Sequence, residues 1–288
     1  MGQWLGIAAL FLLANAPQVW AQNAGYPSKP IRWVVPFAPG GGTDMVARPV
    51  AAKLTDKIGQ HILYDNRGGG GGAIAGDIVA KATPDGYTLL LGADSQITIN
   101  PHLYASMPLD PMKDLVPVAS VAGNQFVLSV NPSLPVKTFQ EFIDYTRRAN
   151  PPIAYASGGN GSQHQMSMEM LKQRASINLT HVPYKGGSPA TTATVAGETL
   201  AMFAGTSSAG QIRSGKLRAL AVTGPHRSAL FPDLPTIGEF YPGYEVTIWL
   251  GLIAPATPPD AVMTRLRADT RAVLGLAEVK DRLNSAGG

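Results

Sequence analysis

One pattern occurs twice in this chain and limits its fold more than any other feature: an apolar strand, a glycine-rich loop and a helix. The first copy covers residues 31–57, with its loop at residues 36–44, and the second covers residues 153–173. In each copy the apolar run of a buried strand gives way, after the loop, to the spacing of a helix. Further strands and helices alternate after each copy, which predicts parallel sheets covered by helices.

These two copies place the chain in the α/β class and divide it into two lobes. Between them, residues 116–130 form a long extended stretch that breaks near Gly123. We therefore expect lobe 1 to consist of residues 26–123 and 224–288, with lobe 2, residues 124–223, inserted between them. Each lobe is expected to hold a mostly parallel sheet flanked by helices.

The first 21 residues carry no charged side chain and read as a secretory signal peptide. An apolar run at residues 4–14 is followed by polar residues and then by Val19-Trp20-Ala21, an A-x-A-like cleavage site. The run is too short to cross a bilayer, for which about 20 apolar residues are needed. We expect cleavage after Ala21 and export to the periplasm; an uncleaved anchor is the alternative. Because the chain has no Cys, a lipid-modified N-terminus is not expected.

The composition suits a folded domain that handles small anions. Hydrophobic residues make up 45% of the chain and charged residues only 15%, so the chain can form a core and disorder is excluded. The net charge is +4, but Lys and Arg are scattered, without the basic runs and interleaved aromatics of a nucleic-acid-binding protein. A modest positive potential favours anionic ligands. We expect a monomer.

The loops at residues 36–44 and 156–164 are the best candidates for a ligand site. Each follows a strand and opens a helix, where unpaired N–H groups and the positive end of the helix dipole favour an anion. Ligands of parallel sheets bind beyond the carboxyl ends of the strands, which is where both loops lie. Two facing loops predict a clamp for a small anion. The alternative is that each loop is only a tight turn with a helix cap.

Polar residues near these loops extend the candidate site. Ser95 and Thr98 follow the third strand, at the edge of the sheet where a ligand is expected. His164 lies in the first turn of the second helix, where it either faces the ligand or covers the helix start. Tyr184 ends a strand in a third glycine turn, beside Lys185. We expect the Gly run at residues 68–72 to be a flexible connection.

The sequence lacks the signatures of common catalytic and cofactor sites. Neither loop completes G-x-G-x-x-G, and no G-x-x-x-x-G-K-[ST], H-E-x-x-H or G-x-S-x-G is present. The five His residues lack the spacing of metal ligands, so we expect no metal and no cofactor. We expect no enzyme activity. The alternative is an exported α/β hydrolase that uses a Ser and a distant His.

Seven short motifs along the chain resemble those of one known family. They are Tyr26-Pro27-x-Lys29-Pro30-Ile31, Pro36-Phe37-x-x-Gly40-Gly41-x-x-Asp44, Pro84-Asp85-Gly86-Tyr87-Thr88-Leu89, Tyr155-Ala156-Ser157-Gly158-Gly159-x-Gly161-Ser162, Val182-Pro183-Tyr184-Lys185-Gly186, Leu220-Ala221-Val222-Thr223 and Pro232-Asp233-x-Pro235-Thr236. Taken together, from Tyr26 to the C-terminus, they resemble the Bug-type receptors of tripartite tricarboxylate transporters.

The resemblance implies a two-lobed periplasmic-binding-protein (Venus flytrap) fold that captures a carboxylate. Citrate, other di- or tricarboxylates, acidic amino acids and aromatic acids are the implied ligands, and membrane permease subunits or a sensor are the implied partners. The family's carboxylate-gripping loops, which act partly through bound water, match Gly40, Gly41, Asp44, Ser157, Gly158, Gly161 and Ser162. With the positions argued above, the predicted ligand-binding residues are Gly40, Gly41, Thr43, Asp44, Ser95, Thr98, Ser157, Gly158, Gly161, Ser162, His164 and Tyr184.

Two positions depart from the family pattern. An acid often follows the Met-Phe strand in the family, whereas Ala204 follows Met202-Phe203 here, so a ligand amine is less expected. Family members usually continue for another helix beyond the point where this chain stops, at Gly288. A receptor fold that no longer binds ligand is therefore a further alternative.

Overall fold

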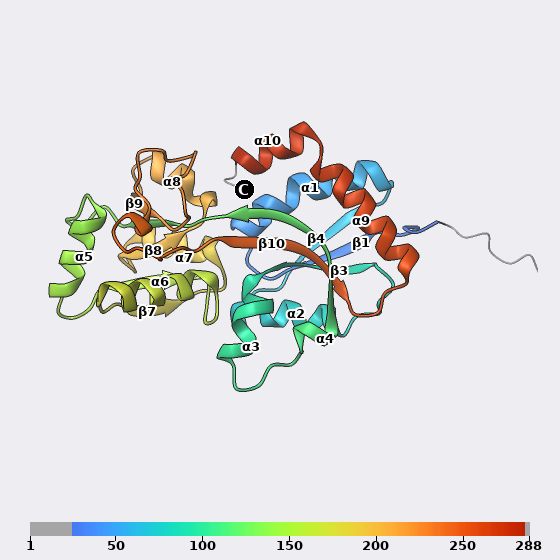
Figure 1. Ribbon diagram of the computed structural model, residues 1–288, viewed down its shortest axis with the longest axis horizontal. Coiled ribbons are helices and arrows are strands. Elements are labelled where there is room, and N and C mark those ends of the chain that lie inside the picture. Colours follow the sequence, from blue (N-terminus) through green and yellow to red (C-terminus); the bar gives the residue numbers. More distant parts are fainter. Residues whose placement is uncertain (1–24, 286–288) are drawn as a thin grey trace, which may run out of the picture.

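The computed structural model describes residues 25–285 and consists of two lobes, each built on a five-stranded sheet (Figure 1). The expected signal peptide at residues 1–21 and the final Gly288 lie outside the described residues. The strands are β1 (Ile31–Val35), β2 (Ile62–Asn66), β3 (Thr88–Ala93), β4 (Leu115–Asn124), β5 (Val127–Val130), β6 (Ala154–Ser157), β7 (Thr180–Pro183), β8 (Ala201–Ala204), β9 (Arg218–Val222) and β10 (Ile248–Pro255). The α-helices are α1 (Gly42–Ile58), α2 (Ala73–Ala80), α3 (Asn100–Leu103), α4 (Pro111–Asp114), α5 (Phe139–Arg148), α6 (Gln163–Ala175), α7 (Gly187–Ala196), α8 (Ala209–Arg213), α9 (Asp260–Leu274) and α10 (Ala277–Ser285). Short turns of 3₁₀ or π helix are η1 (Gly70–Gly72), η2 (Ser95–Ile99), η3 (Thr206–Ser208) and η4 (Ile237–Glu239).

The two sheets share one topology. The order is β2-β1-β3-β10-β4 in lobe 1 and β7-β6-β8-β5-β9 in lobe 2. In lobe 1, β10 runs antiparallel to both of its neighbours while β1, β2 and β3 pair in parallel. In lobe 2, β5 is the antiparallel strand. The predicted two-lobed α/β fold is confirmed. In each sheet, the antiparallel strand is the first strand that the chain forms after it passes over from the other lobe.

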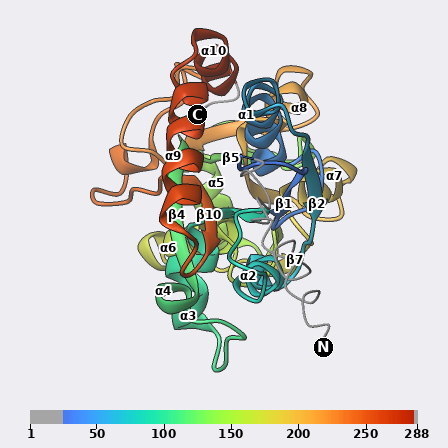
Figure 2. The ribbon, with the colours of Figure 1, turned by 90° about the vertical axis from the view of Figure 1, so that its right-hand side faces the viewer.

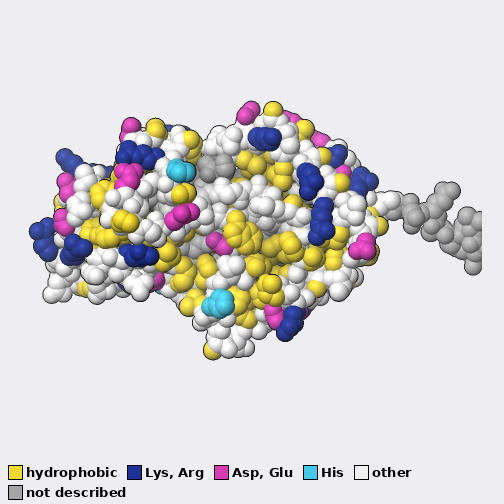
Figure 3. All heavy atoms as spheres, viewed as in Figure 1, with side chains coloured by type: hydrophobic (Ala, Val, Ile, Leu, Met, Phe, Trp, Pro, Cys, Tyr) yellow, Lys and Arg dark blue, Asp and Glu magenta, His cyan; other side chains and the backbone are white. Residues whose placement is uncertain are grey.

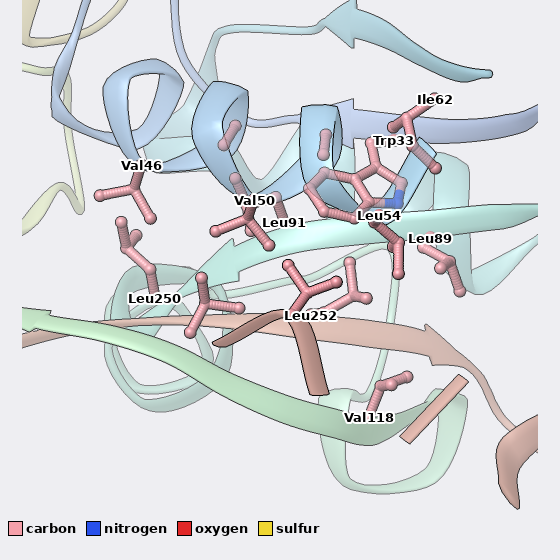
Figure 4. Close-up of a cluster of buried hydrophobic side chains, with 14 of the residues drawn as sticks. Trp33, Val46, Val50, Leu54, Ile62, Leu89, Leu91, Val118, Leu250 and Leu252 are labelled. Carbon is pink, nitrogen blue, oxygen red and sulfur yellow. The ribbon is translucent and has the colours of Figure 1, made fainter. Parts of the chain in front are cut away.

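The central strands of lobe 1, β1 and β3, are mostly apolar and are covered by helices on both faces of the sheet. Trp33, Leu89 and Leu91 pack under α1 and α9, whereas Val34 and Leu90 point to the opposite face and contact α2. All five side chains are fully buried. Figure 4 shows Trp33 and Leu89 in the cluster beneath α1, and Figure 2 shows α9 beside that helix. This rigid support fixes where the loop after β1 begins.

Lobe 2 is built in the same way around its own core. Phe142 and Ile143 of α5 pack with Tyr155 and Leu171 in one buried cluster. Thr138 is the N-cap of α5, since its side chain accepts a hydrogen bond from the backbone N–H of Glu141. Such a cap satisfies a donor that the first helical turn leaves unpaired.

Two strands carry the chain between the lobes, β4 out of lobe 1 and β10 back into it (Figure 1). The part of the chain that passes between the lobes at the ends of these strands is called the crossing. Between them, the Thr223 hydroxyl accepts from the N–H of Phe126 at 2.9 Å and donates to the Val246 carbonyl at 2.8 Å. Ile237 and Tyr244 are buried in the core of lobe 2. The sequence pattern places residues 224–247 in lobe 1. We propose that these residues belong to lobe 2 instead.

Candidate ligand-binding site

A small cavity lies between the lobes, at the carboxyl ends of β1 and β6. The centre of a water molecule can occupy a volume of only about 40 Å³ in this cavity, so the lobes are nearly closed on each other. It is lined by residues of both lobes and of the crossing: Phe37, Gly41, Gly42, Thr43, Asn124, Phe126, Gln163, His164, Gly187, Gly205, Ser207, Ile248 and Leu250. Among them there is no Lys, Arg, Asp or Glu, so the site has no formal charge of its own at neutral pH unless His164 is protonated.

Three long helices begin at this cavity. Gly42 and Thr43 open α1, Gln163 and His164 open α6, and Gly187 opens α7. The N-cap residues of α1 and α7 are glycines, and neither helix has a side-chain cap. Their first N–H groups and their dipoles are therefore available to an anion in the cavity.

The loop after β1 is held in shape by Asp44. The Asp44 carboxylate accepts from the N–H of Gly40 at 3.1 Å and pairs with the Arg48 guanidinium at 2.8 Å. Gly40 has φ +78°, a conformation that favours glycine, and the turn brings Gly41 and Thr43 to the cavity. Asp44 and Gly40 therefore shape the loop, whereas Gly41 and Thr43 line the cavity.

The loop after β6 is held by a Ser–His pair. The Ser157 hydroxyl lies 2.6 Å from Nε2 of His181 and accepts from the N–H of Gly159 at 3.0 Å. Ser162, the N-cap of α6, accepts from the N–H of Gln165, whose own side chain accepts from Gly161 at 2.7 Å. The donors of this loop are thus largely used within lobe 2.

His164 is a buried polar side chain that lines the cavity. Its ring lies 4.4 Å from the ring of Phe126, and a Cβ added at Gly158 would lie 3.0 Å from its Nδ1. That nitrogen is buried without a hydrogen-bond partner among residues 25–285. Burial lowers the pKa of His164 to about 4, so the ring is neutral at physiological pH.

Asp94 joins the two lobes at the edge of this cavity. It follows β3 in lobe 1, and its carboxylate hydrogen-bonds to the side chain of Gln163 in lobe 2. Its Oδ1 is buried without a partner in the described part of the chain. Burial raises the pKa of Asp94 to about 6, against the opposing effect of the Gln163 hydrogen bond. An acid with a raised pKa in an inter-lobe contact is typical of functional clefts.

Three further predicted residues, Ser95, Thr98 and Tyr184, do not line the cavity. Ser95 is fully buried and accepts from the Gln96 side chain at 2.6 Å. Thr98 is exposed and donates to the Asp94 carbonyl at 3.0 Å. Tyr184 packs on small residues of lobe 2 and donates to Glu198 at 3.2 Å. In this closed arrangement none of these three lines the cavity.

Several lining residues are not among those predicted from the sequence. Gly187, Gly205 and Ser207 come from loops after β7 and β8, whose place depends on strand order in lobe 2. Asn124 and Phe126 lie at the crossing. The sequence offered one usable sign, a third glycine turn after β7, which points to the start of α7.

The Gly run at residues 68–72 was predicted to be a flexible connection and is instead a tightly packed contact between the lobes. A Cβ at Gly71 would lie 2.5 Å from the backbone oxygen of Asn160, and one at Gly68 would lie 3.1 Å from that of Lys185. Only glycine permits this close approach of backbones.

A second concavity, an apolar groove on lobe 1, does not suit an anion. It is lined mainly by Ile97, Met112, Leu115, Trp249 and Ile253, and Figure 3 shows the hydrophobic side chains gathered there, near β10. Among residues 25–285, no group of three or more His, Asp or Glu is placed to hold a metal ion. The inter-lobe cavity, which residues of both glycine-rich loops line, is the candidate ligand site.

Comparison with known proteins agrees with this arrangement. A family model described as "Tripartite tricarboxylate transporter family receptor" matches residues 46–287. This chain belongs to that receptor family. Protein BugT of Bordetella pertussis is 34% identical to this receptor over 284 residues, covering 97% of this chain and 87% of BugT.

Two solved structures of related receptors carry carboxylate ligands. Rpa4515 of R. palustris, described with adipate, has a TM-score of 0.88 and 35% identity, over 91% of this chain and 89% of that one. MatC of Rhodopseudomonas palustris, described with bound malate, has a TM-score of 0.86 and 33% identity, over 91% and 90% of the two chains. A further solved structure with a TM-score of 0.88 and 34% identity is described as the periplasmic binding protein BugD. No helix within residues 25–285 is both long and apolar enough to span a bilayer.

Proposed function

We propose that this receptor captures a small carboxylate in the periplasm by closing its two lobes and delivers it to the permease subunits of a tripartite tricarboxylate transporter. The observation that carries the proposal is the meeting of α1 of lobe 1 with α7 of lobe 2 at one cavity, both without a side-chain cap. Each helix start offers N–H donors and a partial positive charge. The adipate and malate described in the related structures support a carboxylate ligand. Residues 1–21 would direct export as a signal peptide, and their cleavage would release the receptor into the periplasm.

Hydroxyl groups add donors to both walls of the site. Thr43 of α1 and Ser207 of η3 line the cavity from opposite lobes, and neither hydroxyl has a hydrogen-bond partner among residues 25–285. Both can donate to a carboxylate oxygen, since hydroxyls rotate to suit an acceptor. A ligand bound to one lobe alone would reach only half of these donors, so it favours the closed state.

Contacts between the lobes hold the closed state even around a small ligand. The N–H of Ala38 donates to the Lys185 carbonyl at 3.2 Å. The Tyr104 hydroxyl donates to the Asn160 carbonyl at 2.9 Å. The free energy of these contacts adds to that of the ligand contacts only when the lobes meet.

Thermal unfolding with a panel of carboxylates tests the proposal. A ligand at 100 times its Kd adds about 2.7 kcal/mol to the free energy of unfolding. We expect at least one carboxylate to raise the melting temperature of the wild type, with one saturable site by calorimetry and no turnover of the ligand. No shift with any carboxylate would contradict the proposal and favour a receptor fold that does not bind.

A matched pair of glycine variants locates the site. Gly42 lines the cavity, and a Cβ there would meet no atom within 4 Å, so Gly42→Val adds bulk beside the ligand space without a Cβ clash. Gly210 of α8 is equally open but lies outside the cavity, and Gly210→Val is the control. We expect G42V to abolish the ligand-induced shift and G210V to retain it. Binding that survives in G42V would contradict the placement of the site.

The second candidate function is hydrolysis by the Ser157–His181 pair, which its 2.6 Å contact favours. Two observations oppose it. Ser157 is fully buried, and its hydroxyl already accepts the N–H of Gly159, which leaves no path for a substrate carbonyl. We expect Ser157→Ala to weaken ligand binding by loosening the loop. Ester hydrolysis by the wild type that disappears in S157A would favour the hydrolase instead.

A further inference from the structure

We infer that the cavity is selective for a monocarboxylate with an apolar body over di- and tricarboxylates. This inference rests on the proposed function and narrows its ligand class. It follows from three features of the cavity. These are an apolar wall, a positive potential that matches one negative charge, and the Asp94 carboxylate at one edge, which has no cationic partner.

The apolar wall is formed by four large side chains from three parts of the fold. Phe37 follows β1, Phe126 lies at the crossing, and Ile248 and Leu250 belong to β10. Each is at least nine-tenths buried in the closed arrangement. A ligand that touches this wall gains free energy only through apolar surface, at about 25 cal/mol per Å². A second carboxylate placed there would lose its hydration without gaining donors.

The positive potential of the site is small. No Lys or Arg lines the cavity, and the His164 ring is neutral because burial lowers its pKa to about 4. Each helix N-terminus carries roughly half a positive charge. The two uncapped helices, α1 and α7, therefore offset about one negative charge, which is the charge of a single carboxylate.

The α6 end of the cavity does not provide a place for a second carboxylate. Ser162 caps α6, and the Gln163 side chain is engaged by the Asp94 carboxylate. No charged side chain among residues 25–285 contributes to the pKa of Asp94, so its negative charge has no cationic partner. A second carboxylate near Gln163 would meet a like charge at low dielectric constant.

A pair of ligands that differ by one carboxylate tests the inference. Hexanoate and adipate have the same six-carbon chain, and calorimetry at pH 7.5 compares their affinities for the wild-type receptor. We expect hexanoate to bind roughly tenfold more tightly than adipate, or better. Equal or tighter binding of adipate would overturn the inference and leave the proposed function intact. Failure of both ligands and of every other carboxylate would overturn both.

Removal of the unpaired acid gives a second test. Asp94→Asn keeps the shape of the side chain and its contact with Gln163. We expect the ratio of the affinity for hexanoate to the affinity for adipate to be smaller in this variant than in the wild type. Asp233→Asn, at an exposed acid of lobe 2 far from the cavity, is the control and keeps the wild-type preference. A ratio in D94N that equals the wild-type ratio would overturn the role given to Asp94.

Discussion

The hydroxyl of Tyr104 in lobe 1 donates a hydrogen bond of 2.9 Å to the backbone oxygen of Asn160 in the second glycine loop. The same oxygen faces Gly71, where a Cβ would lie 2.5 Å away. The Asn100 side chain donates to the Gly71 carbonyl at 3.3 Å and so holds the glycine run in place. One side of the cleft is thus closed by backbone packed on backbone, an arrangement that any added side chain disturbs.

Tyr104→Phe removes the hydrogen bond that spans the cleft. Such a bond contributes about 0.5–1.5 kcal/mol, so we expect the Kd of the ligand to rise by roughly two- to tenfold. The free energy of unfolding should change little, because the bond lies between the lobes and not within one. Tyr184→Phe is the matched control, since its bond to Glu198 stays within lobe 2. Calorimetry that finds equal affinities for the two variants would contradict the role of Tyr104 in closure.

Gly71→Ala places a methyl group against the Asn160 carbonyl. The clash of 2.5 Å with backbone cannot be relieved by a side-chain rotation, so we expect the cleft to stay partly open. Affinity should fall by more than tenfold, and small-angle scattering should show a larger radius of gyration with ligand than in the wild type.

Gly215→Ala separates this clash from backbone strain. Gly71 and Gly215 both have positive φ, at +58° and +74°, but a Cβ at Gly215 meets no atom within 4 Å. Both variants should lose about 1 kcal/mol of stability from the strained conformation. Only G71A should lose affinity and compactness. Similar binding by both variants would show that the glycine run does not govern closure.

The lobes and the first helices could be predicted from local patterns. The apolar run at β1 and the helical spacing after Gly41 are properties of adjacent residues, and Thr138 is recognisable as an N-cap because the cap is local. The loop after β1 was predicted as a site for the same reason, and Gly41 and Thr43 line the cavity.

The rest of the site depends on contacts between distant segments. Ser207 and Gly187 reach the cavity only because β8 and β7 flank β6 in the sheet of lobe 2, and strand order is not a local property. Thr98 follows the third strand as predicted, but the helical turn at Ser95–Ile99 directs it to solvent. The prediction that the Gly run at residues 68–72 is flexible is wrong because a contact between the lobes leaves no periodic pattern in the sequence of either contacting segment.

Asp94 and His164 give stability opposite dependences on pH. The pKa of Asp94 is raised to about 6, so its contribution to stability is fully present below its unfolded value, near 4, and is lost as the pH rises through 6. The pKa of His164 is lowered to about 4. Its contribution is present above its unfolded value, near 6.5, and is lost as the pH falls toward 4.

Asp94→Asn separates the two contributions. Without Asp94, we expect the free energy of unfolding to fall more steeply between pH 6.5 and 4 than in the wild type, because only the loss from His164 remains. We also expect the variant to be the more stable protein at pH 7, since burial of an unpaired carboxylate no longer opposes folding. Urea denaturation at several pH values measures both effects. Parallel curves for D94N and the wild type would contradict the raised pKa of Asp94.

Thr223→Val tests the crossing between the lobes. The Thr223 hydroxyl accepts from the N–H of Phe126 at 2.9 Å and donates to the carbonyl of Val246 at 2.8 Å, and the side chain is fully buried. Valine has the same shape but leaves a buried N–H and a buried carbonyl unpaired, at a cost of about 1–3 kcal/mol for each. We therefore expect urea denaturation to show a loss of roughly 2–6 kcal/mol. Thr192→Val is the control, because that hydroxyl is exposed and bonds within its own helix to Ser188, so its loss should stay within about 0.5 kcal/mol. If T223V were as stable as T192V, water would have to reach the N–H of Phe126 and the carbonyl of Val246, and the Thr223 hydroxyl would not stabilise the connection between the lobes.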